Sequence, residues 1–431
     1  MPRAFFYMTH EVIILGGGCG GLSLLRELCS NYRSLLVEHQ QLGGYASTRN
    51  QSWLHSGSLY SAFLARNELR QNVTASTEAL SCLAQKCRGA FEELRSFCPE
   101  AFEDDSECLF LFETEEEGIK AAEKIGSLGL RADMLEPAEI IAREPVLSPL
   151  TTCPYGLATQ DIPFDSYRIL RKMVKEAHAR GADFHVARVS LCDLAITFDN
   201  GLWRVREDGL TVAEAPVIIC ATGALTRKTM QCILNTDCAL NLDTCLVAVL
   251  HDRICNRIIA MRSEAAQYLN LVPFDGGTAV NLGALDRHTC DVSDDPFDDE
   301  HYQNISETLN DFVPGLKLRS CQTNFYVCQK LSNTEDSSHP VSKFGTRHYF
   351  WLACRDNSFF FYPGKFTLAQ VAAKAFVEHF NPTVQLPEQP KPVSIQPLSP
   401  PAISPRPYYD RATHVLHLSE KGELEFEAVC G

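Results

Sequence analysis

The stretch from residue 49 to residue 57, RNQSWLHSG, contains side chains that can do chemistry. His55 can take a proton from a hydroxyl or an amine, because an imidazole titrates near neutral pH. Arg49 offers a guanidinium that can bind a carboxylate through two parallel hydrogen bonds. The alternative roles are a histidine bonded to backbone in the core and an arginine that only positions a cofactor. The segment predicts proton transfer close to a bound anion.

A glycine-rich turn lies upstream, where Gly16, Gly18 and Gly21 fit the pattern G-x-G-x-x-G. The turn follows the apolar run Val12–Leu15, and leucines at helical spacing follow it. In such a turn the first glycine permits the tight bend, the second lets the backbone approach a pyrophosphate, and the third lets helix and strand pack closely. The predicted cofactor-binding residues here are Gly16, Gly18, Cys19, Gly20 and Gly21. Their amides open a helix, and a helix N-terminus favours an anion.

An acidic residue stands at the end of the next apolar run. Glu38 follows Gly16 by 38 − 16 = 22 positions, close to the spacing of the ribose-binding acid in dinucleotide-binding folds. Its carboxylate can accept hydrogen bonds from ribose hydroxyls and would repel a 2′-phosphate, and His39 follows it directly. The alternative is a glycine-rich turn that binds no ligand. The combination predicts a bound dinucleotide.

The elements around these residues predict an α/β fold in which a Rossmann-type dinucleotide-binding domain is interrupted by an antiparallel-sheet α+β substrate domain. Apolar strand-like segments alternate with helix-like segments at about residues 11–38 and again at about 166–220. A run of strand-like segments follows from about residue 240. We expect a discontinuous dinucleotide-binding domain at residues 10–80, 151–235 and 340–380, a substrate domain at 81–150 and 236–339, and a Pro-rich tail with a C-terminal hairpin at 381–431.

Composition limits the classes of partner. A formal net charge of −15 argues against binding to nucleic acid or to an anionic membrane, because both need a basic surface. No apolar run is long enough to span a bilayer. The 18 cysteines are scattered, without zinc-ligand spacing, so we expect no metal site and a reducing, cytoplasmic location. Small molecules and proteins remain as partners.

From Glu38 onward the sequence resembles the FAD-dependent oxidoreductases of the D-amino-acid oxidase superfamily, above all their glycerol-3-phosphate dehydrogenase and L-2-hydroxyglutarate dehydrogenase branches. Those proteins carry an Arg/Asn/Ser-rich turn followed by two apolar residues, a histidine, a small residue and glycine. The matching positions are Arg49, Asn50, Gln51, Ser52, Trp53, Leu54, His55, Ser56 and Gly57. The resemblance covers about residues 10–380 and implies that the dinucleotide is FAD.

Further stretches are similar to the same family in the same order. EPAEIIAREPVLSP resembles its acidic helix, VIICATGA a turn near the cofactor, and YPGKFTLAQ the turn that opens the last helix over the flavin. The implied additional cofactor-binding residues are Glu38, His39, Arg49, Asn50, Gln51, Ser52, Leu54, Val189, Ala221, Thr222, Gly223, Gly364, Lys365, Phe366 and Thr367. In contrast to the Gly-His-Gly of the amine-oxidase branches, this chain has Tyr-Pro-Gly before the helix.

The resemblance implies an FAD-dependent oxidoreductase, dehydrogenase or oxidase, that moves hydride to flavin N5 from a C–H beside a hydroxyl of a small carboxylate- or phosphate-bearing substrate. His55 and Lys365 are the predicted catalytic residues, and Arg49, Arg262 and Tyr268 the predicted substrate-binding ones. Lys365 as a solvated lysine is the alternative. An amine or amino-acid oxidase and a flavin-binding interaction protein without turnover are the alternative functions. Oxygen, a quinone or a protein would accept the electrons, and covalent flavin attachment stays open.

Overall fold

The computed structural model describes residues 10–39, 41–69, 76–103, 106–148, 153–235, 242–261, 269–274, 276–282, 287–289, 323–331, 349–380, 414–418 and 424–428. Its chain divides into two compact units. Unit 1 comprises Met1–Thr48, Tyr167–Leu242 and Lys330–Ser404, and unit 2 comprises Arg49–Ser166, Asp243–Gln329 and Pro405–Gly431. Each unit is therefore built from segments that are distant in the sequence.

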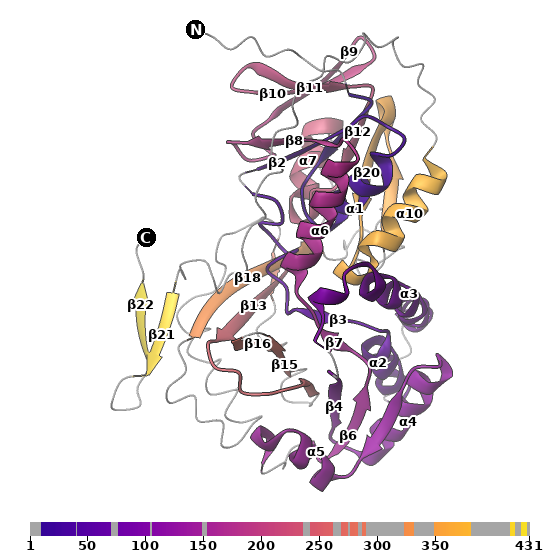
Figure 1. The fold of residues 1–431 in the computed structure, drawn as a ribbon, viewed down its shortest axis with the longest axis vertical. Helices are drawn as coiled ribbons and strands as arrows, with labels where there is room; N and C mark the ends of the chain where they lie inside the picture. Colours follow the sequence, from indigo (N-terminus) through magenta and orange to yellow (C-terminus); the bar gives the residue numbers. More distant parts are fainter. Residues whose placement is uncertain are drawn as a thin grey trace. The chain divides into compact units, whose positions relative to one another are not determined.

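Unit 1 contains a parallel sheet with one antiparallel edge strand (Figure 1). Its strands, in spatial order, are β19 (Phe350–Ala353), β20 (Ser358–Tyr362), β12 (Val217–Cys220), β1 (Val12–Leu15), β2 (Ser34–His39) and β8 (Asp183–Ala187). Only the β19–β20 pair is antiparallel. The central strands β1 and β12 are apolar and buried throughout, as expected for strands covered on both faces.

Helices cover this sheet, and a small antiparallel sheet adjoins it in the same unit. The helices are α1 (Cys19–Leu28), α6 (Ser166–Ala179), α7 (Thr226–Leu234) and α10 (Ala369–His379). The small sheet consists of β9 (Ala195–Asp199), β10 (Leu202–Glu207) and β11 (Leu210–Ala215). Helix α1 packs against α10, and Ser23 of α1 meets Met173 of α6. The start of α1 is thereby held between these helices and the sheet.

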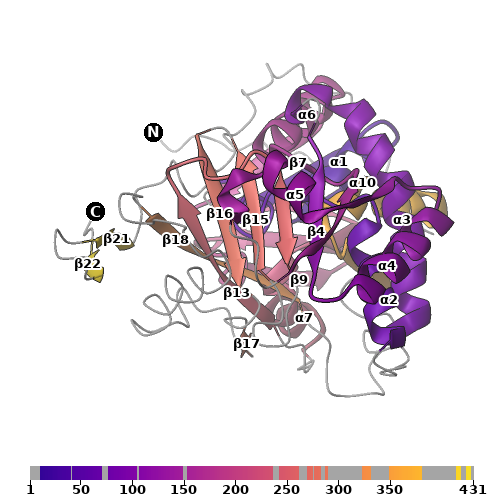
Figure 2. The same cartoon turned by 90° about the horizontal axis from the view of Figure 1, so that it is seen from below.

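Unit 2 is built on a large, mostly antiparallel sheet. Figure 2 shows β13, β16 and β15 as neighbours in it, with β4 further along the same sheet. The strands are, in order, β22 (Leu424–Ala428), β21 (His414–Leu418), β18 (Thr323–Leu331), β13 (Leu242–Leu250), β16 (Gly277–Leu282), β15 (Leu269–Phe274), β14 (Ile258–Met261), β4 (Cys108–Phe112), β6 (Tyr155–Thr159) and β5 (Ala132–Leu135), with β17 (Arg287–Thr289) beside β13. The parallel pair β14–β4 joins the later part of the chain to the earlier part.

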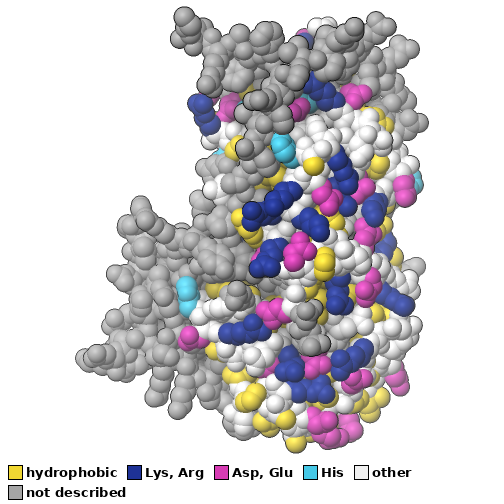
Figure 3. All heavy atoms as spheres, viewed as in Figure 1, with side chains coloured by type: hydrophobic (Ala, Val, Ile, Leu, Met, Phe, Trp, Pro, Cys, Tyr) yellow, Lys and Arg dark blue, Asp and Glu magenta, His cyan; other side chains and the backbone are white. Residues whose placement is uncertain are grey.

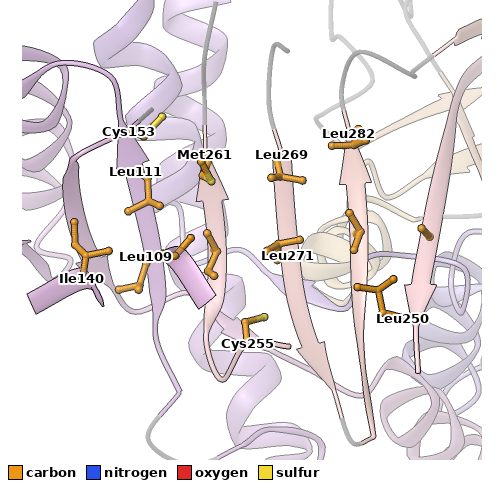
Figure 4. Packing of buried hydrophobic residues seen from close by; sticks show 14 of the residues in the cluster. Leu109, Leu111, Ile140, Cys153, Leu250, Cys255, Met261, Leu269, Leu271 and Leu282 are labelled. Atoms are coloured by element: carbon orange, nitrogen blue, oxygen red, sulfur yellow. The ribbon is translucent and has the colours of Figure 1, made fainter. Parts of the chain in front are cut away.

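Alternating side chains give this sheet a separate apolar core on each face. Leu109 and Leu271 belong to the core shown in Figure 4, to which Ile140 of α5 (Pro137–Arg143) contributes. Phe110 and Val272, their neighbours in sequence, belong to the opposite core. Helices α2 (Ser58–Leu69) and α4 (Glu115–Ser127) pack on that opposite core, and α3 (Ser76–Phe97) packs against α2. Both faces of the sheet are therefore covered.

The predicted fold class is confirmed, with corrections to single elements. The strand, glycine turn, helix and strand at the N-terminus, the helix at 137–143 and the C-terminal hairpin all form. The apolar stretch YFWLACRDNSFFFY predicts one strand before the final helix. This prediction is wrong, because β19 and β20 form a hairpin whose turn places Asp356 and Asn357 at positive φ. The stretch LAITFDNGLWRVRED at 194–208 predicts a hairpin, which forms as β9 and β10, and β11 adds a third strand to it. The functional assignment of the domain segments stays a prediction.

Candidate flavin site and candidate catalytic cluster

The glycine turn of unit 1 connects β1 to α1. Gly16 has a φ of +103°, and a Cβ added there would lie 2.5 Å from the carbonyl oxygen of Ala221. A Cβ added to Gly21 would lie 1.8 Å from the carbonyl oxygen of Gly16. Both positions thus exclude a side chain, so the predicted tight turn and close helix packing are confirmed.

The amides of this turn point at side-chain acceptors. The Gly17 N–H donates to the Glu38 carboxylate at 2.6 Å, and the Cys19 N–H donates to Ser47 Oγ at 2.8 Å. A Cβ on Gly18 would lie 2.9 Å from that same Ser47 oxygen. The sequence reasoning missed Ser47, although a hydroxyl shortly before Arg49 was visible. A turn that offers its N–H groups to oxygen acceptors is suited to a pyrophosphate.

Glu38 is buried at the end of β2, and its side chain also accepts a hydrogen bond from the His39 N–H at 2.6 Å. Burial raises the pKa of Glu38 to about 7, against the opposing effect of the two N–H donors. His39 is half-buried and is the last residue of the strand. Burial likewise raises the pKa of the Cys19 thiol to about 11, so this residue contributes its backbone and not a thiolate.

Two further predicted stretches lie against the glycine turn in unit 1. The Ala221 N–H donates to the Leu15 carbonyl at 2.8 Å, and Gly223 follows at a φ of +55°. On the other side, a Cβ on Gly20 would lie 3.1 Å from Pro363. Ala221 and Pro363 therefore lie against the glycine turn, and the cofactor-binding role of the two stretches stays a prediction.

The last of these stretches leads into α10. Gly364 has a φ of +72°, and Lys365, half-buried, precedes the short 3₁₀ helix formed by Phe366–Leu368. Thr367 is buried. Val189, the remaining predicted residue of this unit, is half-buried just beyond β8, the strand paired with β2.

Buried polar atoms in unit 1 indicate a polar ligand. Gln370 is 3% exposed, and within the described part of the chain neither its Nε2 nor its Oε1 has a hydrogen-bond partner. Thr222 Oγ1 is in the same situation. Leaving such atoms unsatisfied costs free energy, so a ligand is expected to satisfy them. The glycine cradle, the Glu38 acceptor and these polar atoms fit the pyrophosphate, ribose and flavin parts of FAD. Sequence reasoning missed Gln370.

The segment RNQSWLHSG lies in unit 2, where β3 (Trp53–Leu54) pairs with β7 (Ile162–Pro163). Tyr326 donates its hydroxyl to the Asn50 carbonyl at 2.7 Å, and Asn270 Nδ2 approaches Gln51 Oε1 at 3.5 Å. These contacts attach the segment to the large sheet. Ser52 has a φ of +60°, and its N–H donates to the side chain of Asn50.

His55 faces a buried carboxylate. Its Nδ1 lies 3.7 Å from Oδ2 of Asp161, which has no exposed side-chain surface, while the His55 side chain is 15% exposed. The imidazole contacts two aromatic rings, with centroid distances of 4.8 Å to Trp53 and 5.5 Å to Tyr60. Leu54, next to it, is fully buried. Asp161 was not predicted from the sequence.

Arg49 is half-buried at the start of the same segment. No acidic side chain within the described ranges forms an ion pair with it. Arg262 and Tyr268, the other predicted substrate residues, lie outside the described residues. His55 and Arg49 belong to unit 2, and Lys365 belongs to unit 1.

The parallel sheet with its glycine turn, buried acid and polar cradle defines a dinucleotide-binding oxidoreductase fold. The chain belongs to the FAD dependent oxidoreductase family (DAO), whose family model matches residues 11–376. It is accordingly an FAD-dependent oxidoreductase. No described helix is long and apolar enough to cross a membrane.

Individual proteins are similar to this chain in sequence or in fold. The chain is 27% identical to one component of the anaerobic glycerol-3-phosphate dehydrogenase of Escherichia coli K12 over 219 residues, which are 50% of this chain and 38% of that protein. Glycine oxidase from Geobacillus kaustophilus shares the fold with a TM-score of 0.64 at 17% identity, over 88% of this chain and 96% of that one. FAD-bound L-α-glycerophosphate oxidase from Mycoplasma pneumoniae has a TM-score of 0.62 at 14% identity, over 87% and 96%.

Proposed function

We propose that this flavoprotein oxidises a secondary alcohol in a small substrate that carries a carboxylate or a phosphate. The observation that carries the proposal is that His55 and Arg49 lie in one short segment of unit 2. One is a histidine beside a buried carboxylate, and the other is a half-buried arginine that has no ion pair within the described ranges. A base and an anion-binding cation are what such a substrate requires.

FAD, when bound, supplies the acceptor for the hydride that leaves the alcohol carbon. His55 takes the hydroxyl proton as that hydride leaves, and Arg49 holds the anionic group of the substrate so that the carbon is oriented. In unit 1, Lys365 and the start of α10 favour negative charge, since a helix N-terminus presents free N–H groups. Glu38 and the amides of the glycine turn hold the ribose and pyrophosphate.

The names of the relatives support oxidation of a carbon that bears a hydroxyl. They are also compatible with oxidation of a carbon that bears an amine. Glycerol-3-phosphate and glycerophosphate appear in two of the names, and glycine in the third. A general base serves both reactions, because a hydroxyl and a protonated amine must each lose a proton. The substrate panel must therefore contain both classes.

The test is anaerobic mixing of the FAD-loaded protein with 2-hydroxy acids, glycerol phosphate and amino acids, with flavin bleaching as the readout. We expect hydroxy acids or glycerol phosphate to bleach the flavin. His55→Asn should slow the reduction by about 100-fold or more while the flavin stays bound. Arg49→Met should weaken substrate binding by about tenfold or more. The matched control is His178→Asn, which changes a half-buried histidine of unit 1.

Bleaching by amino acids alone would overturn the proposal in favour of amine oxidation. Reduction of the His55→Asn protein at the wild-type rate would remove His55 from the mechanism. An Arg49→Met protein that binds neutral alcohols and anionic substrates with unchanged affinities would remove Arg49 from substrate binding. Repeating the bleaching with oxygen or a quinone present identifies which acceptor returns the flavin to its oxidised state.

A further inference from the structure

A fully buried carboxylate in unit 2 has no role in the function proposed so far. Asp161 lies between β6 and β7 and accepts three hydrogen bonds. Its Oδ2 accepts from Trp53 Nε1 at 2.9 Å, and its Oδ1 accepts from the Ser56 N–H at 3.0 Å and from the Ser56 hydroxyl. Both carboxylate oxygens therefore have fixed directions.

The strand register explains why Asp161 meets His55. Leu54 pairs with Ile162 in the antiparallel β3–β7 ladder, so the next residues outward on the two strands are His55 and Asp161. Oδ2, which already accepts from Trp53, lies 3.7 Å from His55 Nδ1. The rings of Trp53 and Tyr60 pack against the imidazole, and this packing restricts its rotation. The carboxylate consequently faces one defined edge of the ring.

A negative charge at this edge selects one form of the neutral imidazole. A proton on Nδ1 is attracted to the carboxylate, whereas a lone pair on Nδ1 is repelled by it. The carboxylate therefore favours the form with the proton on Nδ1 and the lone pair on Nε2. A histidine in this form takes a proton at Nε2, and the imidazolium that results is stabilised by the same carboxylate.

We propose that Asp161 is a positioning residue that holds His55 as the Nδ1–H tautomer, with Nε2 directed to the substrate proton. The proposal rests on the function proposed above for His55. Asp161 acts through His55 and touches neither substrate nor flavin. A carboxylate that only fastened the start of β7 to β3 and to the turn after β3 would need its bonds to Trp53 and Ser56. Such a role would place no requirement on the tautomer of His55.

The tautomer can be measured directly in the full-length, FAD-loaded protein. With ¹⁵N-labelled histidine at pH 8.5, where an ordinary imidazole is neutral, the ring-nitrogen signals of His55 are assigned by their loss in His55→Asn. We expect the Nδ1–H form in the wild type and in Ser56→Ala, which removes a donor to Oδ1 but keeps the charge. In Asp161→Asn we expect a shift to the Nε2–H form or to a mixture.

Kinetics supply the second readout. Asp161→Asn should lower the limiting rate of anaerobic flavin reduction on the order of 10²–10⁴-fold while the substrate dissociation constant changes by less than about threefold. Ser56→Ala should stay within about tenfold of the wild-type rate. An Nε2–H tautomer of His55 in the wild type would overturn the proposal, and this result does not depend on whether any variant folds. So would an Asp161→Asn protein with an unchanged tautomer or rate.

These measurements distinguish a failure of the proposed function from a failure of the proposed role of Asp161. If His55→Asn reduces its flavin at the wild-type rate, the proposed function of His55 fails. The tautomer measurement, which needs no substrate, still decides whether Asp161 holds the ring.

Discussion

The Glu38 side chain, which binds the glycine turn, makes the stability of the FAD-free protein depend on pH. Its pKa rises from an ordinary value of 4.5 to about 7, chiefly because the carboxylate is buried. Between about pH 4.5 and about pH 7, Glu38 has lost its proton in the unfolded chain but keeps it in the folded, FAD-free protein. The unfolded state then binds fewer protons, so the free energy of unfolding falls as pH rises from about 4.5 to about 7. We predict a loss of about 3 kcal/mol from this group.

Urea unfolding of the FAD-free protein at pH 5 and pH 7.5 measures this loss. Other groups titrate in both proteins, so the wild type is compared with Glu38→Gln, in which the contribution of this carboxyl is absent. Glu92→Gln, at an exposed position of α3, is the matched control and should behave as the wild type. Equal pH dependence in the wild type and Glu38→Gln would show that burial does not hold the proton on Glu38.

Glu38 and Asp161 differ in how far a sequence can reveal them. Glu38 was predicted because the dinucleotide-binding turn imposes a spacing along the chain between its glycines and its acid. Asp161 became visible only when β3 paired with β7, since its partner His55 is 106 positions away by 161 − 55. Gln370 was missed for a related reason, because burial without hydrogen-bond partners is a property of the packed structure.

At the scale of elements, the contact between α1 and β1 depends on a missing side chain. A Cβ on Gly21 would overlap the Gly16 carbonyl oxygen at 1.8 Å, and backbone cannot yield as a flexible side chain can. Gly21→Ala should therefore lower the free energy of unfolding by about 3 kcal/mol or more. Gly89→Ala is the matched control, since a Cβ in the middle of α3 meets nothing within 4 Å. It should stabilise the protein by about 1 kcal/mol.

Thermal or chemical unfolding of the two alanine variants checks this prediction. If both change stability by the same amount, the close packing of α1 on the turn is unimportant. Binding of FAD to Gly21→Ala at low temperature provides a second measurement, and we expect weaker binding because the helix start shifts.

Elements with a strong local pattern were predictable, and those defined by pairing were not. Apolar runs between turns predicted β1 and β12, and helical spacing of leucines predicted α1. In contrast, β3 has two residues and exists only through its partner β7. The β19–β20 hairpin was read as one strand because its turn, with Asp356 and Asn357, contains no glycine or proline.

At the scale of the whole molecule, the chain crosses between its two units several times. The sequence predicted such an interruption from the change in element pattern, but the pairing of β14 with β4 was not visible there, since parallel neighbours carry no local signal.

Figure 3 shows Lys and Arg side chains lying among Asp and Glu side chains on one face. Ion pairs such as Arg253–Glu103 at 2.8 Å illustrate this mixing. Exposed pairs of this kind contribute little to stability.

Removal of FAD should affect the units unequally. Because the glycine turn, the 221–223 turn and the start of α10 all lie in unit 1, FAD should slow hydrogen exchange in peptides that cover 16–21, 221–223 and 363–370. Exchange in β4, within the sheet of unit 2, should change much less. FAD at a hundred times its dissociation constant should also raise the free energy of unfolding by about 2.7 kcal/mol.

NAD is the control ligand, because it shares the adenosine and pyrophosphate but carries no flavin. We expect NAD, where it binds, to protect 16–21 and leave 363–370 unchanged. Equal protection of 363–370 by NAD and FAD would contradict a flavin site at the start of α10, and uniform protection of both units would contradict a site held by unit 1.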